Sequence, residues 1–222
     1  MKFDAIAFDL DGTLYAAWRF YIKTLPFYAL KNLRLLSAFG LARNKLRKTG
    51  TVQLDFYDAQ AAACAKLLNK PKEKTRRNLD KNIYALWQEK YKNIRLYPHA
   101  LETLKLFRER GLKTALLTDF QIKERVADFG LSGMFDIELC SEDCGALKPH
   151  KEPFLRLSAA LGVSAERILY VGNNFKCDII GSKNAGFGAA ALIRKQSASS
   201  KIKEMADLVF KDYRQLQDFV LN

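Results

Sequence analysis

The sequence predicts an α/β protein built on a parallel β-sheet, and three observations lead to this prediction. Short apolar runs of the kind that form buried strands alternate with helical segments along most of the 222 residues. The first run ends at once in two aspartates, Asp9 and Asp11, which Gly12 follows. A long stretch, 15–97, then interrupts the alternation with helical patterning. Alternating strands and helices imply a parallel sheet with right-handed crossovers.

The strands of this sheet are short and lie between helical segments. We expect strands at 4–8, 113–117, 137–140, 168–171 and 189–193, with a further one at 208–210. We expect helices at 99–110, 121–129, 151–161 and 177–185. The glycines in Leu131-Ser132-Gly133 and Leu161-Gly162-Val163 are typical of turns that end helices.

The two aspartates stand where open α/β sheets place their ligands, at the C-terminal end of a strand. Because side chains alternate along a strand, Asp9 and Asp11 share a side if the strand geometry continues. Two such carboxylates can divide a reaction, one attacking as a nucleophile and the other transferring protons. The alternative is that Asp11-Gly12 is only a turn signal. The apolar run before the aspartates and Thr13-Leu14 after them favour the catalytic interpretation.

Three later segments place polar residues after predicted strands. They contain Thr118-Asp119, then Lys148-Pro149, and finally the run 172–178, which reads Gly-Asn-Asn-Phe-Lys-Cys-Asp. With Asp-x-Asp-Gly-Thr at 9–13, these segments resemble, in order and spacing, the four motifs of the haloacid dehalogenase superfamily. Most members of that superfamily are magnesium-dependent phosphohydrolases. The resemblance covers essentially the whole chain apart from 15–97, and it implies a Rossmann-like core.

The resemblance implies a role for each motif residue. Asp9 would attack the substrate phosphorus and form an aspartyl-phosphate, while Asp11 would protonate the leaving alcohol and then activate water. Thr118 and Lys148 would contact the phosphoryl group, with Asp119 beside them in the substrate site. Because a nearby carboxylate and partial burial raise the pKa of a carboxyl group, we expect a raised pKa for Asp11.

The resemblance also implies a Mg²⁺ site formed by Asp9, Asp178 and the backbone carbonyl of Asp11. The family usually has an aspartate where this chain has Asn173. An amide oxygen can ligate Mg²⁺, which prefers oxygen ligands, but it adds no charge, so we expect weaker metal binding. Three alternatives to a phosphatase stay open: a non-catalytic binding protein, a phosphomutase and a dehalogenase. Dehalogenases of the superfamily usually lack an aspartate at the position of Asp11.

The insert 15–97 carries the net charge of the chain. It holds eighteen basic and five acidic residues, and the formal net charge of the whole chain is +13. By resemblance the insert is a C1 cap, a small helical domain that closes over the active site. We therefore expect a core domain of residues 1–14 and 98–222 and a cap of residues 15–97. A lid of this kind excludes water and supplies substrate contacts.

The cap is expected to contain three helical segments, 18–41, 52–68 and 72–91. The first has an apolar stripe, which we expect to pack in the cap interior, and Pro26 is expected to kink or divide this helix. The stripe consists of Trp18, Ile22, Leu25, Ala29, Leu33 and Leu36. Inward positions of the third segment are Leu79, Ile83, Leu86 and Trp87.

The positive charge of the cap has three interpretations: a solvated surface, steering of a small phosphorylated substrate, or contact with nucleic acid or an anionic membrane. We favour the first two, and do not expect nucleic acid as a partner. A basic cluster, which we interpret as a loop, is a candidate for holding the leaving group of the substrate. It consists of Arg43, Lys45, Arg47 and Lys48.

Composition favours an intracellular protein. The four cysteines form no Cys-x-x-Cys pair and are expected to be free thiols in a reducing cytoplasm. The chain opens on a predicted core strand, so we expect no signal peptide. No run of eighteen uncharged apolar residues is present, and we expect no transmembrane helix. The oligomeric state and the identity of the phosphate ester do not follow from the sequence.

Overall fold

In the part of the chain that the structure describes, six strands form one parallel sheet, which confirms the predicted α/β fold class. The computed structural model describes residues 2–28, 32–50, 52–122, 124–194 and 198–222. The strands are β1 (Ala5–Phe8), β2 (Lys113–Thr118), β3 (Ile137–Cys140), β4 (Ile168–Gly172), β5 (Ala189–Ile193) and β6 (Leu208–Phe210). Their order across the sheet is β3-β2-β1-β4-β5-β6. All six lie where the apolar runs predict them.

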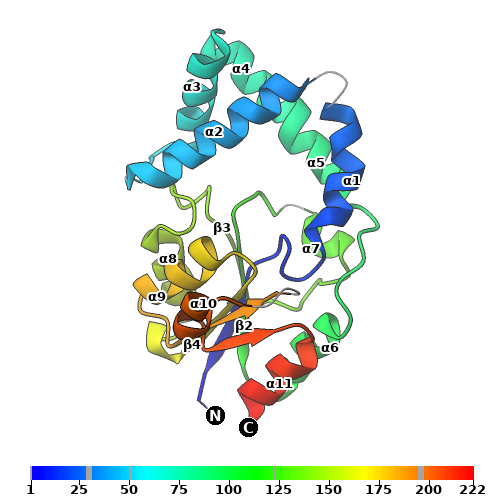
Figure 1. The fold of residues 1–222 in the computed structure, drawn as a ribbon, viewed down its shortest axis with the longest axis vertical. Coiled ribbons are helices and arrows are strands. Elements are labelled where there is room, and N and C mark those ends of the chain that lie inside the picture. Colours follow the sequence, from blue (N-terminus) through cyan, green and yellow to red (C-terminus); the bar gives the residue numbers. More distant parts are fainter. Residues whose placement is uncertain (1, 29–31, 51, 123, 195–197) are drawn as a thin grey trace.

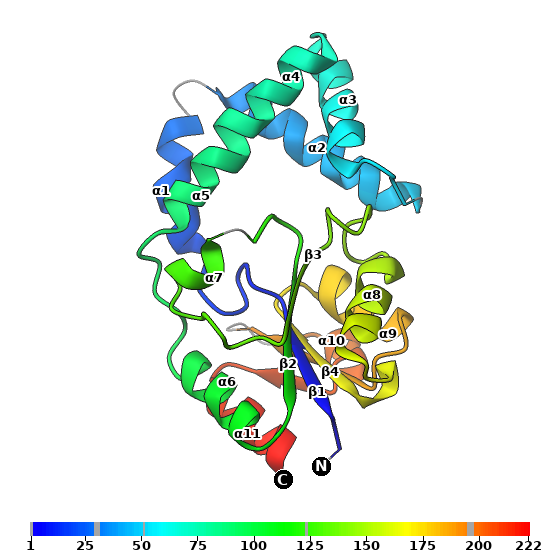
Figure 2. The same cartoon turned by 180° about the vertical axis from the view of Figure 1, so that it is seen from behind.

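Helices cover both faces of the sheet, which explains why its strands are continuous apolar runs. The core helices are α6 (Ala100–Glu109), α7 (Arg125–Asp128), α8 (Lys151–Leu161), α9 (Gly181–Asn184), α10 (Ser200–Met205) and α11 (Tyr213–Leu221). Alternate residues of β1 point to opposite faces: Ile6 and Phe8 pack in the cluster with α6 and α11, and Ala5 and Ala7 in the cluster with α8. Figure 2 shows α6 and α11 together on one side of the strands and α8 and α9 on the other.

Among the π-helical turns of the described residues, two lie within longer helical stretches. One runs over Asp80–Ala85 and joins two cap helices into one continuous rod, while the other, Phe175–Ile180, leads into α9. A π-helical turn has a wider hydrogen-bonding pattern and is frequent at functional sites. The second one carries Asp178, a residue of the predicted site.

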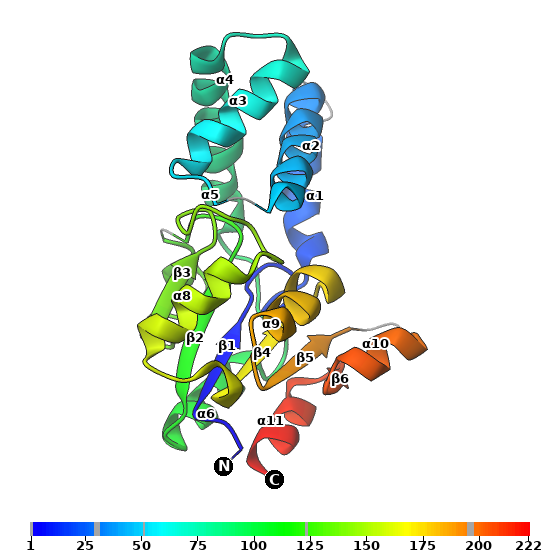
Figure 3. The ribbon, with the colours of Figure 1, turned by 90° about the vertical axis from the view of Figure 1, so that its left-hand side faces the viewer.

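Helices from the insert form a separate layer above the sheet. They are α1 (Ala17–Phe27), α2 (Leu33–Thr49), α3 (Phe56–Leu68), α4 (Lys72–Leu79) and α5 (Leu86–Tyr91). Figures 1 and 3 show this layer at one end of the molecule, with both chain termini at the opposite end. Of the helices in the described ranges, none is long and apolar enough to cross a membrane.

The prediction that the apolar stripe of the first cap helix packs in the cap interior is mostly wrong. Trp18, Ile22 and Leu25 point outward, with 56%, 62% and 53% of their surface exposed. The buried side of α1 is formed by Phe20 and Thr24, one helical turn apart, and Phe20 stacks on a tyrosine of α5. Leu33 is also exposed at 60%, and Ala29 lies outside the described residues. Pro26 lies in the last turn of α1.

Two further expectations about elements need correction. The basic cluster 43–48 is not a loop, because all of it belongs to α2. Residues such as Leu, Ala, Arg and Lys favour helix throughout this segment, and Gly50 in the left-handed conformation ends the helix. The helix expected at 121–129 is shorter, since α7 spans only Arg125–Asp128.

Candidate active site

The site lies at the central strand of the sheet, at its C-terminal edge. From β1 the chain passes to β2 and β3 on one side of the sheet, and it then crosses over to β4 on the other side of β1. The strand order therefore reverses at β1. Ligands of open α/β sheets bind at such a switch point. Asp9 follows β1, and its amide still donates to the Val171 carbonyl at 2.9 Å, which fixes the nucleophile candidate in line with the strand.

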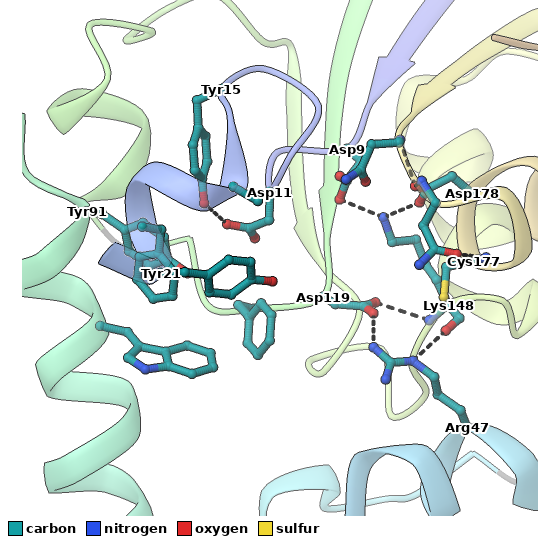
Figure 4. A pocket seen from close by; sticks show the side chains of 16 residues that line it. Asp9, Asp11, Tyr15, Tyr21, Arg47, Tyr91, Asp119, Lys148, Cys177 and Asp178 are labelled. Carbon is teal, nitrogen blue, oxygen red and sulfur yellow. Dashed lines mark hydrogen bonds and ion pairs between the residues drawn. The ribbon is translucent and has the colours of Figure 1, made fainter. Parts of the chain in front are cut away.

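Asp9 and Asp178 are held together by Lys148. The Lys148 ammonium lies 2.8 Å from Oδ1 of Asp9 and 2.8 Å from Oδ1 of Asp178, and all three side chains are almost completely buried. It also donates to the Tyr170 hydroxyl at 3.0 Å. Thr13 donates to the second oxygen of Asp9 at 2.7 Å. Figure 4 shows Lys148 between the two carboxylates.

Two glycines allow the loops of the site to approach each other. Gly172 has no room for a side chain, because a Cβ atom there would lie 2.3 Å from Cβ of Asp178. Gly12 has φ +88°, and a Cβ atom on it would lie 2.1 Å from Nδ2 of Asn173. The Asn173 side chain therefore lies directly against the Asp-x-Asp-Gly loop, with its Oδ1 3.5 Å from Oγ1 of Thr13.

Asp11 has partners that the sequence interpretation missed. Arg125 and Tyr15 both donate to Oδ1 of Asp11, and Thr118 donates to Oδ2 at 3.1 Å. Burial raises the pKa of Asp11, but the Arg125 guanidinium and these hydrogen bonds outweigh it and lower the pKa below its ordinary value. The expectation of a raised pKa is wrong, since the decisive neighbour of this carboxylate is a cation.

Asp119 ties the cap to the core. Its carboxylate accepts hydrogen bonds from Ser141 at 2.5 Å, from the backbone amide of Lys148 at 3.1 Å and from Arg47 of α2 at 2.7 Å. Burial raises the pKa of Asp119, but the positive charges of Arg47, Lys148 and Arg43 outweigh burial and lower the pKa to about 2. Asp119 is thus an ionised residue that orients Arg47 at the site.

Arg43 does not lie where the sequence interpretation expects it. Its guanidinium is buried and donates to Glu142, to Oε1 of Gln60 at 3.0 Å and to the Asp119 carbonyl at 2.7 Å. The hydroxyl of Tyr84 donates to the same Glu142 oxygen at 2.8 Å. Because protein surrounds the guanidinium on all sides, Arg43 attaches α2 to the core and does not line the cavity.

A cavity of about 270 Å³ lies between the cap and the edge of the sheet. Most of the predicted site residues line it, and Thr118 and Arg43 do not. The predicted residues that line the cavity are Asp9, Asp11, Arg47, Asp119, Lys148, Asn173 and Asp178. Segments far apart in the sequence, from β1 to the π-helical turn at 175–180, thus meet around one space. Thr118 lies behind Asp11, to which it donates.

The oxygen atoms that line this cavity could hold a Mg²⁺ ion that takes only a few of its ligands from the protein. Two carboxylates, of Asp9 and Asp178, and the amide of Asn173 lie at one end, next to the backbone of the 9–13 loop. In the described ranges, no three acidic, histidine or cysteine side chains converge as a metal cluster would require. Mg²⁺ commonly binds through one or two carboxylates, with water and substrate phosphate completing its shell. The donor set therefore suits Mg²⁺.

Lys148 alone does not offset the cost of the negative charge on Asp9, the candidate nucleophile. Burial raises the pKa of Asp9, Lys148 opposes this, and the carboxylates of Asp178 and Asp11 add to it, so the pKa is about 7. Burial lowers the pKa of Lys148, but the carboxylates of Asp178 and Asp9 outweigh it and raise the pKa above its ordinary value. A further positive charge beside Asp9 would favour its ionised form, which is the nucleophilic one.

Comparison with known proteins agrees with this geometry. The sequence model of the haloacid dehalogenase-like hydrolases matches residues 3–186. A phosphoglycolate phosphatase of Haemophilus influenzae is 28% identical over 228 residues, covering 97% of each chain. A glyceraldehyde 3-phosphate phosphatase of Methanocaldococcus jannaschii is 27% identical and covers 98% of this chain and 96% of its own.

The fold is also similar to that of solved dehalogenases. The L-2-haloacid dehalogenase from Xanthobacter autotrophicus superposes with a TM-score of 0.69 at 21% identity, covering 99% of both chains. This similarity confirms the Rossmann-like core that the motifs imply. The prediction of an enzyme of this superfamily is confirmed as well: with the family match extending from the strand before Asp9 to beyond Asp178, the chain belongs to the haloacid dehalogenase-like hydrolases.

Proposed function

We propose that this protein is a magnesium-dependent phosphatase that cleaves a small phosphate monoester through an aspartyl-phosphate on Asp9. One observation carries the proposal: the buried Asp9 carboxylate ends the central strand, with Lys148 on one oxygen and Thr13 on the other. Full-length relatives named as phosphatases support the reaction class.

In the first step, a carboxylate oxygen of Asp9 attacks phosphorus, the bond from phosphorus to the ester oxygen breaks, and the leaving oxygen takes the proton carried by the carboxyl group of Asp11, which becomes a carboxylate. Asp11 is the acidic group closest in the chain to the nucleophile and lines the same cavity. Lys148 offsets negative charge that the phosphoryl group brings next to Asp9 and Asp178. When bound, Mg²⁺ supplies further positive charge to the phosphoryl oxygens, held by Asp9, Asp178, Asn173 and the backbone carbonyl of Asp11.

In the second step, water attacks the phosphorus of the aspartyl-phosphate and gives its proton to Asp11. The bond between phosphorus and the Asp9 oxygen breaks, which releases inorganic phosphate and restores the carboxylate. The hydrogen bonds from Arg125, Tyr15 and Thr118 orient Asp11 and favour the ionised form that accepts this proton.

Phosphate release from a set of phosphate monoesters, with Mg²⁺ and with EDTA, tests the proposal. Asp9→Asn is expected to remove turnover, while Asp4→Asn, at the exposed residue just before β1, serves as the matched control. Wild-type turnover in Asp9→Asn, or turnover that EDTA leaves unchanged, would contradict the mechanism.

The same samples separate the rival reactions. A dehalogenase would release halide from a 2-haloacid without Mg²⁺, and Asp11 in the cavity argues against it. A phosphomutase would need a cation for a second phosphate, whereas the cations lining the cavity in the described ranges, Lys148 and Arg47, already contact carboxylates. A non-catalytic protein would turn over none of these compounds.

The partner that the cavity supports is a small phosphorylated molecule. Of the basic residues of the cap, only Arg47 is among the described residues lining the cavity, so steering by the others would act over a distance.

Contact with an anionic membrane remains a separate proposal, supported by the exposed Trp18, Ile22 and Leu25 of α1. A cytoplasmic location is proposed from the four free cysteines.

A further inference from the structure

The cavity has two chemically different sides. In Figure 4, Tyr15, Tyr21 and Tyr91 lie on one side, opposite Lys148 and Asp178. The rings that line the cavity, here called the aromatic wall, belong to Tyr15, Phe20, Tyr21, Trp87, Tyr91 and Phe120. The reacting groups therefore face a surface of rings. Tyr15 donates to Asp11, and the other rings have no role in the phosphoryl chemistry proposed above.

Contacts between its own rings hold the aromatic wall in place. Phe20 stacks on Tyr91 with ring centroids 4.5 Å apart and packs edge-on against Trp87 at 5.3 Å. Trp87 in turn packs against Phe120 at 4.9 Å. Because each ring is fixed by the next, a flat ligand that lies on this wall would not have to order it first.

Tyr21 is the member of the wall that offers the most free surface. It is 55% exposed, packs edge-on against Phe20 at 6.0 Å, and its hydroxyl makes no hydrogen bond to a described residue. In Figure 4 its ring lies beside Asp11, and its hydroxyl end points toward Asp119. A planar group bound to a phosphate at Asp9 would have this ring as a stacking partner.

The cavity has little to offer a second negative charge. Lys148 contacts Asp9 and Asp178, and Arg47 contacts Asp119 and the carbonyl of Lys148. These are the two cations among the described residues that line the cavity. An anionic leaving group would meet carboxylates and rings there, so an uncharged one is favoured.

We propose that the site selects phosphate monoesters whose alcohol carries a small, planar, uncharged aromatic ring, which stacks on Tyr21 and the aromatic wall. This inference rests on the proposed phosphatase activity. The volume of about 270 Å³ admits one ring system beside the phosphate, because it lies at the small end of ligand cavities.

Two ring esters of matched size and one smaller, anionic ester test the proposal. Benzyl phosphate has the planar ring, cyclohexylmethyl phosphate has the same carbon skeleton without planarity, and phosphoglycolate has a carboxylate. We expect kcat/KM for benzyl phosphate to exceed each of the others by roughly tenfold, the upper range for one aromatic pair. A higher kcat/KM for phosphoglycolate, or equal values for the two ring esters, would overturn the inference and leave the phosphatase proposal standing.

Variants on one helix locate the effect. Tyr21→Leu is expected to bring the ratio of kcat/KM for benzyl over cyclohexylmethyl phosphate close to one. Trp18→Leu, an equally exposed aromatic of α1 outside this cavity, is expected to keep the wild-type ratio. A ratio that Tyr21→Leu leaves at the wild-type value would contradict stacking on Tyr21.

A binding measurement separates this inference from the proposed reaction. In Trp18→Phe, Trp87 is the remaining tryptophan and reports on the wall. Benzylphosphonate, which has no ester bond to cleave, is expected to change its fluorescence and to bind at least several-fold more tightly than cyclohexylmethylphosphonate. Such binding in a protein that hydrolyses no phosphate ester would refute the proposed function and support the aromatic subsite. Equal binding of the two phosphonates would refute the subsite whatever the enzyme hydrolyses.

Discussion

Arg125 donates a hydrogen bond to Asp11 from a position where its side chain has no exposed surface. Its guanidinium carbon lies 3.8 Å from the centroid of the Tyr91 ring, so the cation sits between an aromatic face and the carboxylate. A buried charge that loses its partner destabilises the folded protein strongly. The ion pair therefore holds Asp11 in one position in the site.

Arg125→Met is expected to lower the free energy of unfolding by about 1–3 kcal/mol, because the cavity-lining carboxylate of Asp11, whose side chain is 22% exposed, would lose its buried cation. Urea denaturation measures the change, and Arg110→Met, at the exposed end of α6, is the control. Adding Asp11→Asn to Arg125→Met is expected to recover part of the loss. No loss in the single variant would show that the pair is not buried in solution.

Arg43→Met is expected to act on stability and on the docking of α2, with a loss of about 3–5 kcal/mol for the same reason. The partner here is Glu142, which is completely buried. Lys45→Met, exposed on the same helix, is the control, and the double variant Arg43→Met with Glu142→Leu is expected to lose less than Arg43→Met alone. A normal stability with a raised KM would instead return Arg43 to the substrate site.

The sheet was predictable because its inner strands are almost completely buried and appear as apolar runs, and because a motif follows each of β1, β2, β3 and β4. Asp9, Lys148 and Asp178 were predictable for the same reason, since each follows a strand at one edge of the sheet. Arg125 gave no comparable signal: a single arginine in a short helical stretch looks like a surface residue. Its partner comes from a segment more than a hundred positions earlier in the chain.

The cap was less predictable, since helical periodicity states which residues share a face and not what covers that face. Trp18, Ile22 and Leu25 do share a face, but α5 packs on the side of α1 that carries Phe20. Arg43 and Arg47, four positions apart on α2, both point toward the core, yet one is sealed in a buried ion pair and the other reaches the cavity.

In magnesium-free buffer, Asp9 is expected to make the protein less stable as the pH rises. Its pKa is raised from 3.8 to about 7 in the folded state, mainly by burial. The protonated form is therefore favoured on folding: its contribution is complete below about pH 4 and is lost as the pH approaches about 7. The free energy of unfolding of wild type relative to Asp9→Asn should fall over this range. A difference that stays constant with pH would contradict the burial of Asp9.

Asn173→Asp is expected to lower the Mg²⁺ concentration that gives half-maximal activity, because it adds a carboxylate beside the 9–13 loop. Asn174→Asp is the matched control, since its side-chain oxygen caps the amide of Cys177 at 2.9 Å. The same added charge at position 174 should therefore help less. An equal effect of both variants would indicate a general electrostatic effect, and no effect of Asn173→Asp would place residue 173 away from the metal.

The central claim is that Asp9 becomes covalently phosphorylated during turnover. Mass spectrometry of Asp11→Asn, rapidly acid-quenched while hydrolysing a phosphate ester with Mg²⁺, tests it most directly, because loss of the base slows removal of the phosphoryl group by roughly 10²–10⁴-fold. We expect the peptide containing Asp9 to carry one phosphoryl group, and the same peptide from Asp9→Asn/Asp11→Asn to carry none. Hydrolysis without phosphorylation of that peptide, or a phosphoryl group found on another residue, would contradict the mechanism.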